Sequence, residues 1–483
     1  MRNHAIAGGA RAIPAAGNPP GLIDLVRLRA DAPSLALFLL LSAFVLIPGL
    51  VLGPHTDAGI FATIGEQLTR GDLPYRDAWD HKPPGIYAVA AIAALLPGPT
   101  WPAFWAISVM FLAATGQVLQ WIVGRPLAAV AVLAMGLYPA ATGGGQTEAF
   151  AALPAAIAFL MASRQRWFVS GLAAGCALIF SFQLAPLLVA LVVLAGARPR
   201  PILLGVGGVL VSCGAVVVLL AAVGILPAAF DALVTYDRIY LGSSRSGDLR
   251  SIHNLGVVLL PLAAALPFGA RRVPDRSDLA AFAWCCAAAI FLALQGRLFA
   301  HYVIPLGIPL AVLARQPLQR KVARLAVVAA TAVMVAVSFF VVVAEAPAHR
   351  GPPSATIGRW VRDHTQPSDT VLVWGLDSAV YVLADRAPAG RYPYHLPLLT
   401  PAYTTPALIA AWVADLAANP PAVIVDSEAA NGYWADESDF LRAPPPGTEG
   451  GRTVDLLDPF RDWASARYAF VTEIDGRKIY LRQ

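Results

Sequence analysis

Residues 34–53 read SLALFLLLSAFVLIPGLVLG, an unbroken apolar run. About 20 such residues cross the hydrocarbon core of a bilayer. Similar runs recur along the 483 residues, of which 57% are hydrophobic and 13% charged, whereas soluble domains carry about 25% charged residues. The sequence therefore predicts a polytopic α-helical membrane protein. Residues 1–33, ahead of the first run, are expected to form a cytoplasmic N-terminal tail.

The candidate spans number about eleven by length and hydropathy. They are 34–53, 102–123, 126–142, 148–163, 167–182, 184–197, 201–223, 253–269, 279–296, 300–315 and 323–344. The run 86–97 (IYAVAAIAALLP) is shorter than a crossing needs. If it stays at the interface, most Lys and Arg of the loops fall on the side of the N-terminus, and if it crosses, this bias disappears. The positive-inside rule favours the first arrangement, with a cytoplasmic N-terminus and an outer C-terminus.

This topology divides the chain into a transmembrane domain, 34–345, and an extracytoplasmic domain, 346–483. The outer loop 54–101 belongs to the first. The C-terminal part gains charge and proline, and its runs DTVLVWG, PAVIVD and RYAFVTEIDGRKIYL predict strands separated by helical patterns. We therefore expect a small α/β domain on the outer face of a bacterial cytoplasmic membrane.

The four cysteines and the net charge of +5 exclude several classes of site. The basic residues lie between apolar runs, so no nucleic-acid partner is expected. The cysteines all fall inside apolar runs and predict neither a disulfide framework nor a metal site. They are Cys176, Cys213, Cys285 and Cys286.

Charge gathers in the outer loop, within HTDAGIFATIGEQLTRGDLPYRDAWDHKPPGIY (55–87). Residues 57–70 have apolar positions at helical spacing and predict an amphipathic helix at the membrane surface. A carboxylate at this boundary can take a proton from an acceptor hydroxyl, and a lysine can bind a lipid phosphate. The candidates are Asp57, Asp77, Asp80, His81 and Lys82. The alternative is a solvated loop in which Asp57 caps a helix and Lys82 extends to the interface.

The element G-D-x-P-Y-R-D-x-W-D-x-K-P-P-G (71–85) follows an acidic residue just beyond the first span. In this it resembles the GT-C superfamily of membrane glycosyltransferases, near the bacterial relatives of protein O-mannosyltransferases and of the lipid A aminoarabinose transferase. The resemblance implies a polyprenyl-phosphate-linked sugar as donor and a lipid, glycan or protein acceptor. It implies Asp57 as the catalytic acidic residue and Lys82 as a contact of the carrier phosphate. Gln183 departs from relatives that carry a lysine near this point.

Weaker candidates lie at the outer ends of later spans. Glu148 begins a span after three glycines, where an acid also suits a helix N-terminus. Arg297 is a candidate phosphate ligand, with His301 and Tyr302 as neighbours, and the same residues also fit an interfacial anchor. The carboxylates are compatible with a divalent metal, but no ligand spacing demands one.

The leading hypothesis is thus a glycosyltransferase in which Asp57 activates the acceptor and Lys82, with Arg297, stabilises the leaving phosphate. Asp80 and His81 would shape the pocket or share proton transfer. One alternative is a membrane transporter, although the spans are nearly free of charge and show no paired repeat. Another is a non-catalytic member of the family that acts as a scaffold.

Overall fold

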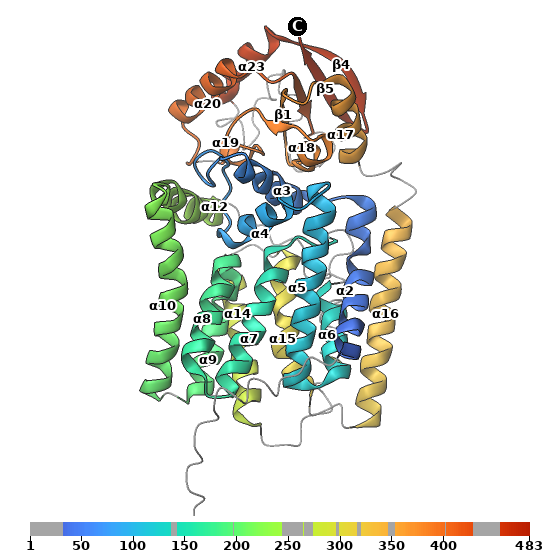
Figure 1. The fold of residues 1–483 in the computed structure, drawn as a ribbon, viewed down its shortest axis with the longest axis vertical. Helices are drawn as coiled ribbons and strands as arrows, with labels where there is room; N and C mark the ends of the chain where they lie inside the picture. The colour runs from blue at the N-terminus through green and yellow to red at the C-terminus, as the bar shows by residue number, and fades with distance from the viewer. Residues whose placement is uncertain are drawn as a thin grey trace, which may run out of the picture.

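The computed structural model describes a bundle of upright helices with a small sheet at one end (Figure 1). The described residues are 32–136, 143–196, 198–243, 264, 274–295, 299–315, 320–345, 353–400, 402–427 and 455–483. Among them, four helices are long and apolar enough to cross a membrane. They are α2 (Ala32–Leu52), α5 (Thr100–Val123), α10 (Pro199–Ala222) and α14 (Arg276–Gln295). These helices give the chain the character of a polytopic membrane protein.

Further helices of the bundle occupy most of the remaining candidate spans. They are α6 (Arg125–Gly136), α7 (Thr147–Ser163), α8 (Trp167–Phe180), α9 (Pro186–Ala195), α15 (Gly307–Ala314) and α16 (Lys321–Glu345). The candidate span 253–269 lies almost wholly outside the described residues. Glycines let α8 and α10 pack closely, because a Cβ on Gly171 would lie 1.9 Å from the Gly205 carbonyl oxygen. Small residues at helix contacts are typical of membrane bundles.

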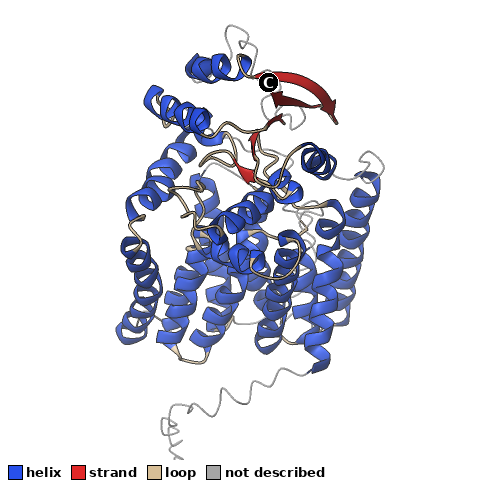
Figure 2. Cartoon of the chain, turned by 45° about the horizontal axis from the view of Figure 1, so that its top comes forward, coloured by secondary structure: helices blue, strands red, loops and turns tan. Residues whose placement is uncertain are grey.

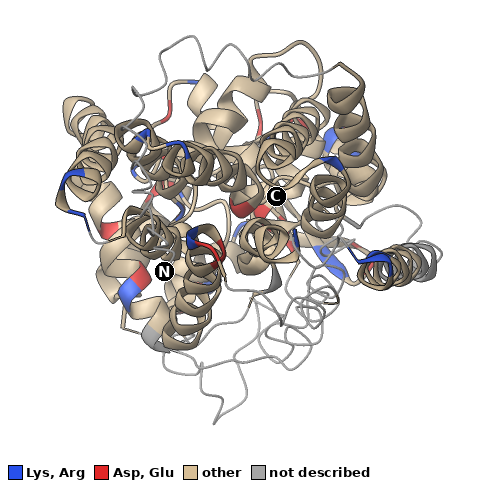
Figure 3. Ribbon diagram, turned by 90° about the horizontal axis from the view of Figure 1, so that it is seen from below, with Lys and Arg blue, Asp and Glu red and all other residues tan. Residues whose placement is uncertain are grey.

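The connections α5–α6, α7–α8 and α9–α10 lie at the end of the bundle opposite the sheet (Figure 1). Figure 3 views the molecule from this end, with Lys and Arg in blue. Basic residues flank these connections and the start of α16, namely Arg125, Arg164, Arg166, Arg198 and Lys321. Several of the basic clusters used to predict the topology therefore share one end of the bundle.

Helices α3 (Thr56–Thr69) and α4 (Gly85–Ala94) lie between the bundle and the sheet (Figure 1). The 10 residues of α4 rise about 15 Å, half the thickness of a hydrocarbon core. Gly65 lets the two helices touch, since a Cβ there would lie 2.5 Å from the Ala90 carbonyl carbon. The sequence predicted α3 as a surface helix, but the structure buries most of it. Its small residues allow neighbours to pack on more than one side.

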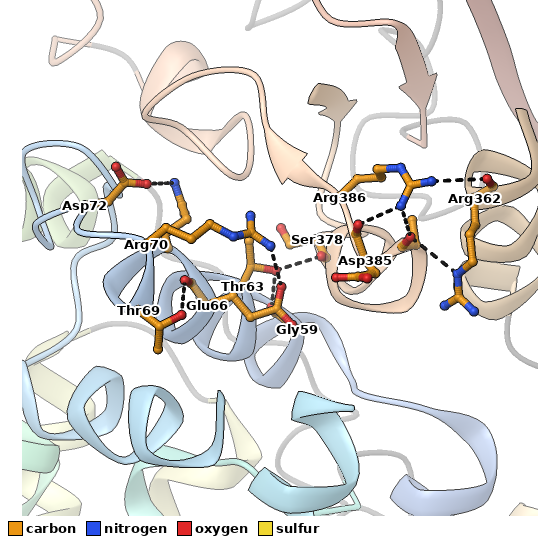
Figure 4. Close-up of polar contacts among 12 residues, drawn as sticks. Gly59, Thr63, Glu66, Thr69, Arg70, Asp72, Arg362, Ser378, Asp385 and Arg386 are labelled. Atoms are coloured by element: carbon orange, nitrogen blue, oxygen red, sulfur yellow. Dashed lines mark hydrogen bonds and ion pairs between the residues drawn. The ribbon is translucent and has the colours of Figure 1, made fainter. Parts of the chain in front are cut away.

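One of those neighbours is the C-terminal segment, which rests on α3 through α18 (Ala379–Ala384) (Figure 4). The Thr63 hydroxyl oxygen lies 2.8 Å from the Gly59 carbonyl oxygen and 3.1 Å from that of Ser378. A Cβ on Gly59 would lie 2.7 Å from the backbone nitrogen of Ala379. Glycine at position 59 is therefore what permits the two backbones to approach.

Within the described residues, the sheet has five strands in the order β2-β1-β3-β5-β4. Strands β2 (Ala387–Pro388) and β3 (Val423–Asp426) flank β1 (Thr370–Trp374) in parallel, while β5 (Arg477–Arg482) lies antiparallel between β3 and β4 (Tyr468–Ile474). Positive φ angles of 51° at Asp475 and 80° at Gly476 close the β4–β5 hairpin, as this pair of residues predicts. Figure 2 shows that these strands occupy one end of an otherwise helical chain.

Helices cover both faces of β1, which explains its continuous apolar sequence. Val371 and Val373 pack with α17 (Pro353–His364) and α18. Leu372 and Trp374 belong to a second core shared with α20 (Pro406–Ala418) and α23 (Asp458–Ser465). The same core contains residues of α3, α4 and the loop between them. The outer loop and the C-terminal segment thus form one packed layer above the bundle.

The remaining described helices are short. They are α11 (Leu226–Phe230), the π-helix η2 (Asp231–Tyr236), α12 (Asp237–Ser243), α19 (Leu396–Leu399) and the 3₁₀ helices η1 (Phe182–Leu184), η4 (Ala300–Leu306) and η7 (Asp455–Leu457).

Candidate active site

A cavity of about 290 Å³ opens where the outer loop meets the bundle. Its walls combine charged and amide side chains with apolar ones, the composition expected of a site for an amphiphilic ligand. The lining residues are His81, Lys82, Pro83, Glu148, Ser181, Phe182, Gln183, Leu233, Val234, Asp237, Arg238, Tyr240, Leu241, Phe291, Gln295 and Tyr302. Several sequence candidates, from three distant segments, therefore meet at one cavity.

Lys82 supplies a cation to this cavity. Its ammonium nitrogen lies 6.0 Å from the centroid of the Tyr302 ring, a cation–π geometry. No carboxylate in the described part of the chain forms an ion pair with it. Burial alone would lower the pKa of Lys82, but Tyr302, Asp57 and Glu148 favour the charged form and raise the pKa above its ordinary value. Lys82 is thus a charged group able to bind an anion.

Asp57 lies in the first turn of α3, where the helix dipole favours an acid. Burial alone would raise the pKa of its carboxyl, yet the charges of Lys82, His301 and His55 hold the pKa below its usual range. Asp57 makes no hydrogen bond or ion pair with the residues that the structure describes. The Asp57 carboxylate is therefore held in its charged form by electrostatic coupling to Lys82, although Asp57 itself does not line the cavity.

Glu148 is buried in the cavity wall at the start of α7. Ser181 donates a hydrogen bond to one carboxylate oxygen at 3.0 Å, and Thr147 donates to the other at 2.9 Å. The turn before α7 fits against α3 because Gly145, at φ +85°, leaves room for Ala58, which a Cβ would approach to 2.6 Å. The glycines thereby bring the turn that leads to Glu148 against α3.

His81 forms part of the opposite wall. Its Nδ1 atom lies 2.6 Å from the Asp237 carboxylate, and its ring packs against Tyr236 and Tyr240 with centroids 5.1 and 5.3 Å away. Asp237 therefore orients the imidazole at the edge of the cavity, as carboxylates commonly do for functional histidines.

Asp80 does not line the cavity. Tyr87 and Tyr394 donate hydrogen bonds to its two oxygens at 2.8 and 2.6 Å, and the side chain is 2% exposed. The Tyr87 hydroxyl also accepts a hydrogen bond from the Lys82 amide at 3.1 Å. Asp80 thus fixes the loop that carries Lys82, which agrees with a part in shaping the pocket, the first of the two roles expected for it.

The other candidates fall in three groups. Asp77 lies away from the cavity, where it accepts hydrogen bonds from Arg76 and from the Leu73 amide. His301 and Tyr302 lie on η4, where Tyr302 lines the cavity beside Lys82 and His301 does not line it. Arg297 lies outside the described residues.

Sequence reasoning missed several polar residues of this region. Gln183 donates a hydrogen bond to Gln295 at 2.9 Å across the cavity wall, and Gln295 had drawn no attention. The sequence signal for both glutamines is an amide side chain at the end of an apolar span. Polar groups are energetically costly there, so their presence indicates a functional site. Tyr394 was also missed, since its partner Asp80 lies more than 300 positions away in sequence.

The described residues contain no group of three or more His, Cys, Asp or Glu side chains that could hold a metal ion.

Neither a protein-family model nor a curated protein matches the sequence. A solved structure does match the fold, namely ArnT from Cupriavidus metallidurans in the apo state, a GT-C glycosyltransferase. The TM-score is 0.59 at 16% identity, over 94% of this chain and 98% of that one. The chain has the GT-C fold.

The GT-C fold agrees with the resemblance that the sequence shows over residues 55–87. A second solved structure, an Archaeoglobus fulgidus oligosaccharyltransferase in complex with Zn and sulfate, matches with a TM-score of 0.43 at 15% identity. That match covers 83% of this chain and 69% of the other.

Proposed function

We propose that this chain is an integral membrane glycosyltransferase that transfers a sugar from a polyprenyl-phosphate carrier to an acceptor on the outer face of the cytoplasmic membrane. The observation that carries the proposal is a cavity of about 290 Å³ that is lined by Lys82, whose cation is electrostatically coupled to the Asp57 carboxylate outside the lining. One residue is an ionised acid with no hydrogen-bond partner among the described residues, and the other is a charged lysine that forms no ion pair with them.

Glycosyl transfer from a lipid phosphate needs both groups. Asp57 takes the proton of the acceptor hydroxyl, whose oxygen then attacks the anomeric carbon of the sugar. The bond between that carbon and the phosphate oxygen breaks, and the phosphate leaves on its lipid. Lys82 stabilises the negative charge that develops on this leaving group, which is the kind of contribution that usually dominates catalysis.

The remaining candidates take supporting roles in this proposal. His81, oriented by Asp237, donates a hydrogen bond to the phosphate or to a sugar hydroxyl. Glu148 and the Gln183–Gln295 pair accept and donate hydrogen bonds to the hydroxyls of the sugar. Asp80 and Asp77 stabilise the loop that carries Lys82 through their hydrogen bonds. Arg297 is a second ligand for the phosphate.

The outer-face location rests on the distribution of charge. The connections flanked by basic residues lie at the end of the bundle opposite the sheet, and such loops favour the cytoplasm. The cavity lies between the bundle and the sheet, so this orientation exposes it to the outer interface.

The test is a binding and transfer experiment with the full-length protein in nanodiscs. Undecaprenyl phosphate should quench tryptophan fluorescence with saturation, and a radiolabelled undecaprenyl-phosphate sugar should pass its label to acceptors in native membranes. Movement of the intact lipid-linked sugar across the bilayer without transfer would favour a transporter. Absence of binding would refute the proposal.

A further inference from the structure

One wall of the cavity is a continuous segment, residues 231–241, that follows α10 and α11 in the chain. This segment contacts the C-terminal layer, by which we mean the described residues from 353 onward. It consists of the π-helix η2 and the start of α12. Its residues that line the cavity are Leu233, Val234, Asp237, Arg238, Tyr240 and Leu241. The position of this one segment therefore sets much of the shape and charge of the cavity.

Two hydrogen bonds hold the segment from above, both from the turn after α19. Tyr403 donates to the Asp231 carboxylate at 2.7 Å. The hydroxyls of Tyr236 and Thr400 lie 3.1 Å apart. Because Thr400 donates its own hydrogen to the Leu396 carbonyl oxygen at 2.7 Å, Tyr236 is the donor of the pair. The two bonds bracket η2, one at each end.

Aromatic packing surrounds the same contact. Tyr236 is fully buried and meets Tyr403 edge to face, with centroids 4.9 Å apart, and Trp79 at 4.7 Å. The next residue, Asp237, binds His81 on the side of the cavity. A displacement of Tyr236 would therefore also move the neighbouring Asp237, whose carboxylate orients His81.

The π-helix makes this segment sensitive to its anchors. A π turn holds one extra residue compared with an α turn, is rare, and is often found at functional sites. If η2 relaxed to an α-helix, each later residue would turn by about 100° around the axis, since an α-helix has 3.6 residues per turn. Asp237 and Arg238 would then leave their places in the cavity.

We propose that Tyr403 and Thr400 are positioning residues for the cavity, through which the C-terminal layer holds the π-helix and so the donor-binding wall. This inference rests on the proposed function of the cavity as a lipid-phosphate site. It assigns the C-terminal layer a part in donor binding, in addition to covering the bundle.

The test compares single-hydroxyl variants in nanodiscs. Tyr403→Phe and Thr400→Val each remove one hydroxyl and leave a side chain of similar shape. Each should weaken binding of undecaprenyl phosphate about threefold to tenfold, the usual effect of one hydrogen bond. The donor KM should rise by the same factor while kcat stays within about twofold. Thr400→Ser keeps the hydroxyl and should behave as the parent.

Tyr468→Phe is the matched control, because the Tyr468 hydroxyl donates to the Pro421 carbonyl oxygen at 2.7 Å in the same layer, and neither residue lines the cavity. It should leave lipid affinity unchanged even if it lowers the unfolding temperature. The double variant Tyr403→Phe with Asp231→Ala should bind undecaprenyl phosphate no more weakly than the weaker-binding single variant. The reason is that both changes remove the same contact, the hydrogen bond between Tyr403 and Asp231.

Parent-like affinity in both Tyr403→Phe and Thr400→Val would overturn the inference and leave the proposed function intact. An equal loss in Tyr468→Phe would also overturn it, because the effect would then be general loosening of the layer. Failure of the parent protein to bind undecaprenyl phosphate would instead overturn the proposed function itself.

Discussion

The ammonium of Lys82 lies 6.0 Å from the centroid of the Tyr302 ring, which joins the outer loop to the short helix η4, more than 200 positions later in the sequence. Lys82 is also electrostatically coupled to Asp57 and Glu148. The cavity is therefore a meeting point of the loop before α4, α7 and η4, and its function depends on how these segments are held.

Replacement of Lys82 by Met should remove the cation and keep the length of the side chain. Charge-assisted hydrogen bonds contribute about 1.5–3 kcal/mol, so affinity for undecaprenyl phosphate should fall about tenfold to a hundredfold. The measurement is fluorescence titration in nanodiscs. Arg76→Met is the control, because Arg76 is exposed and paired with Asp77. Equal affinity of the Lys82 variant and the parent would remove its phosphate role.

Tyr394→Phe should loosen the loop that carries Lys82. The change leaves one oxygen of the buried Asp80 carboxylate without its donor, which costs about 1–3 kcal/mol. A lower unfolding temperature and a lower kcat/KM are expected together. Tyr392→Phe is a suitable comparison, since the Tyr392 hydroxyl bonds to nothing in the described chain. If both variants behave alike, the tyrosine–Asp80 contact does not support the site.

Gly59→Val should separate the C-terminal layer from α3, because the new Cβ would lie 2.7 Å from the Ala379 nitrogen. Overpacking of this kind costs about 1–3 kcal/mol, measured as a lower unfolding temperature. Gly214→Ala on α10 meets nothing within 4 Å and should be neutral or slightly stabilising. Similar stability of the two variants would show that the close approach at Gly59 is unimportant.

Glu66→Gln should change how stability depends on pH. Burial, first of all, raises the pKa of Glu66 from 4.5 to about 7 in the folded chain. The folded state therefore binds the proton more tightly than the unfolded state, and the parent loses stability as pH rises from 4.5 to about 7. The loss over this range is roughly 3 kcal/mol at 1.36 kcal/mol per pKa unit.

The measurement for Glu66 is the unfolding temperature across this pH range. Glu66→Gln should flatten the curve, and Glu473→Gln on the exposed edge strand β4 should keep the shape of the parent curve. A parent curve that is flat between these pH values would contradict the assignment.

The sequence predicted the membrane class, the short helix α4 and the strands because each follows from a local pattern. Apolar length identifies a span, and the Asp475-Gly476 pair identifies a hairpin. Lys82 and Glu148 were also found locally, as charged residues beside apolar runs. The motif 71–85 added the GT-C resemblance, which the fold supports.

The sequence did not predict which charged residues face the cavity. Asp77, Asp80 and His81 lie within five positions, yet only His81 lines it. Asp80 is turned away by Tyr394, and His81 is oriented by Asp237. Both partners come from segments whose position depends on tertiary packing. The burial of α3 was missed for the same reason, since its cover, α18, begins more than 300 residues later.

The most direct test of the proposed mechanism is transfer of radiolabel from an undecaprenyl-phosphate sugar to acceptors in native membranes, by the parent and by Asp57→Asn. The variant keeps the shape of the side chain and removes the base. Undecaprenyl phosphate should still bind through Lys82, while kcat should fall about 10²–10⁴-fold. Transfer by Asp57→Asn at the rate of the parent would contradict the role of Asp57 as the catalytic base.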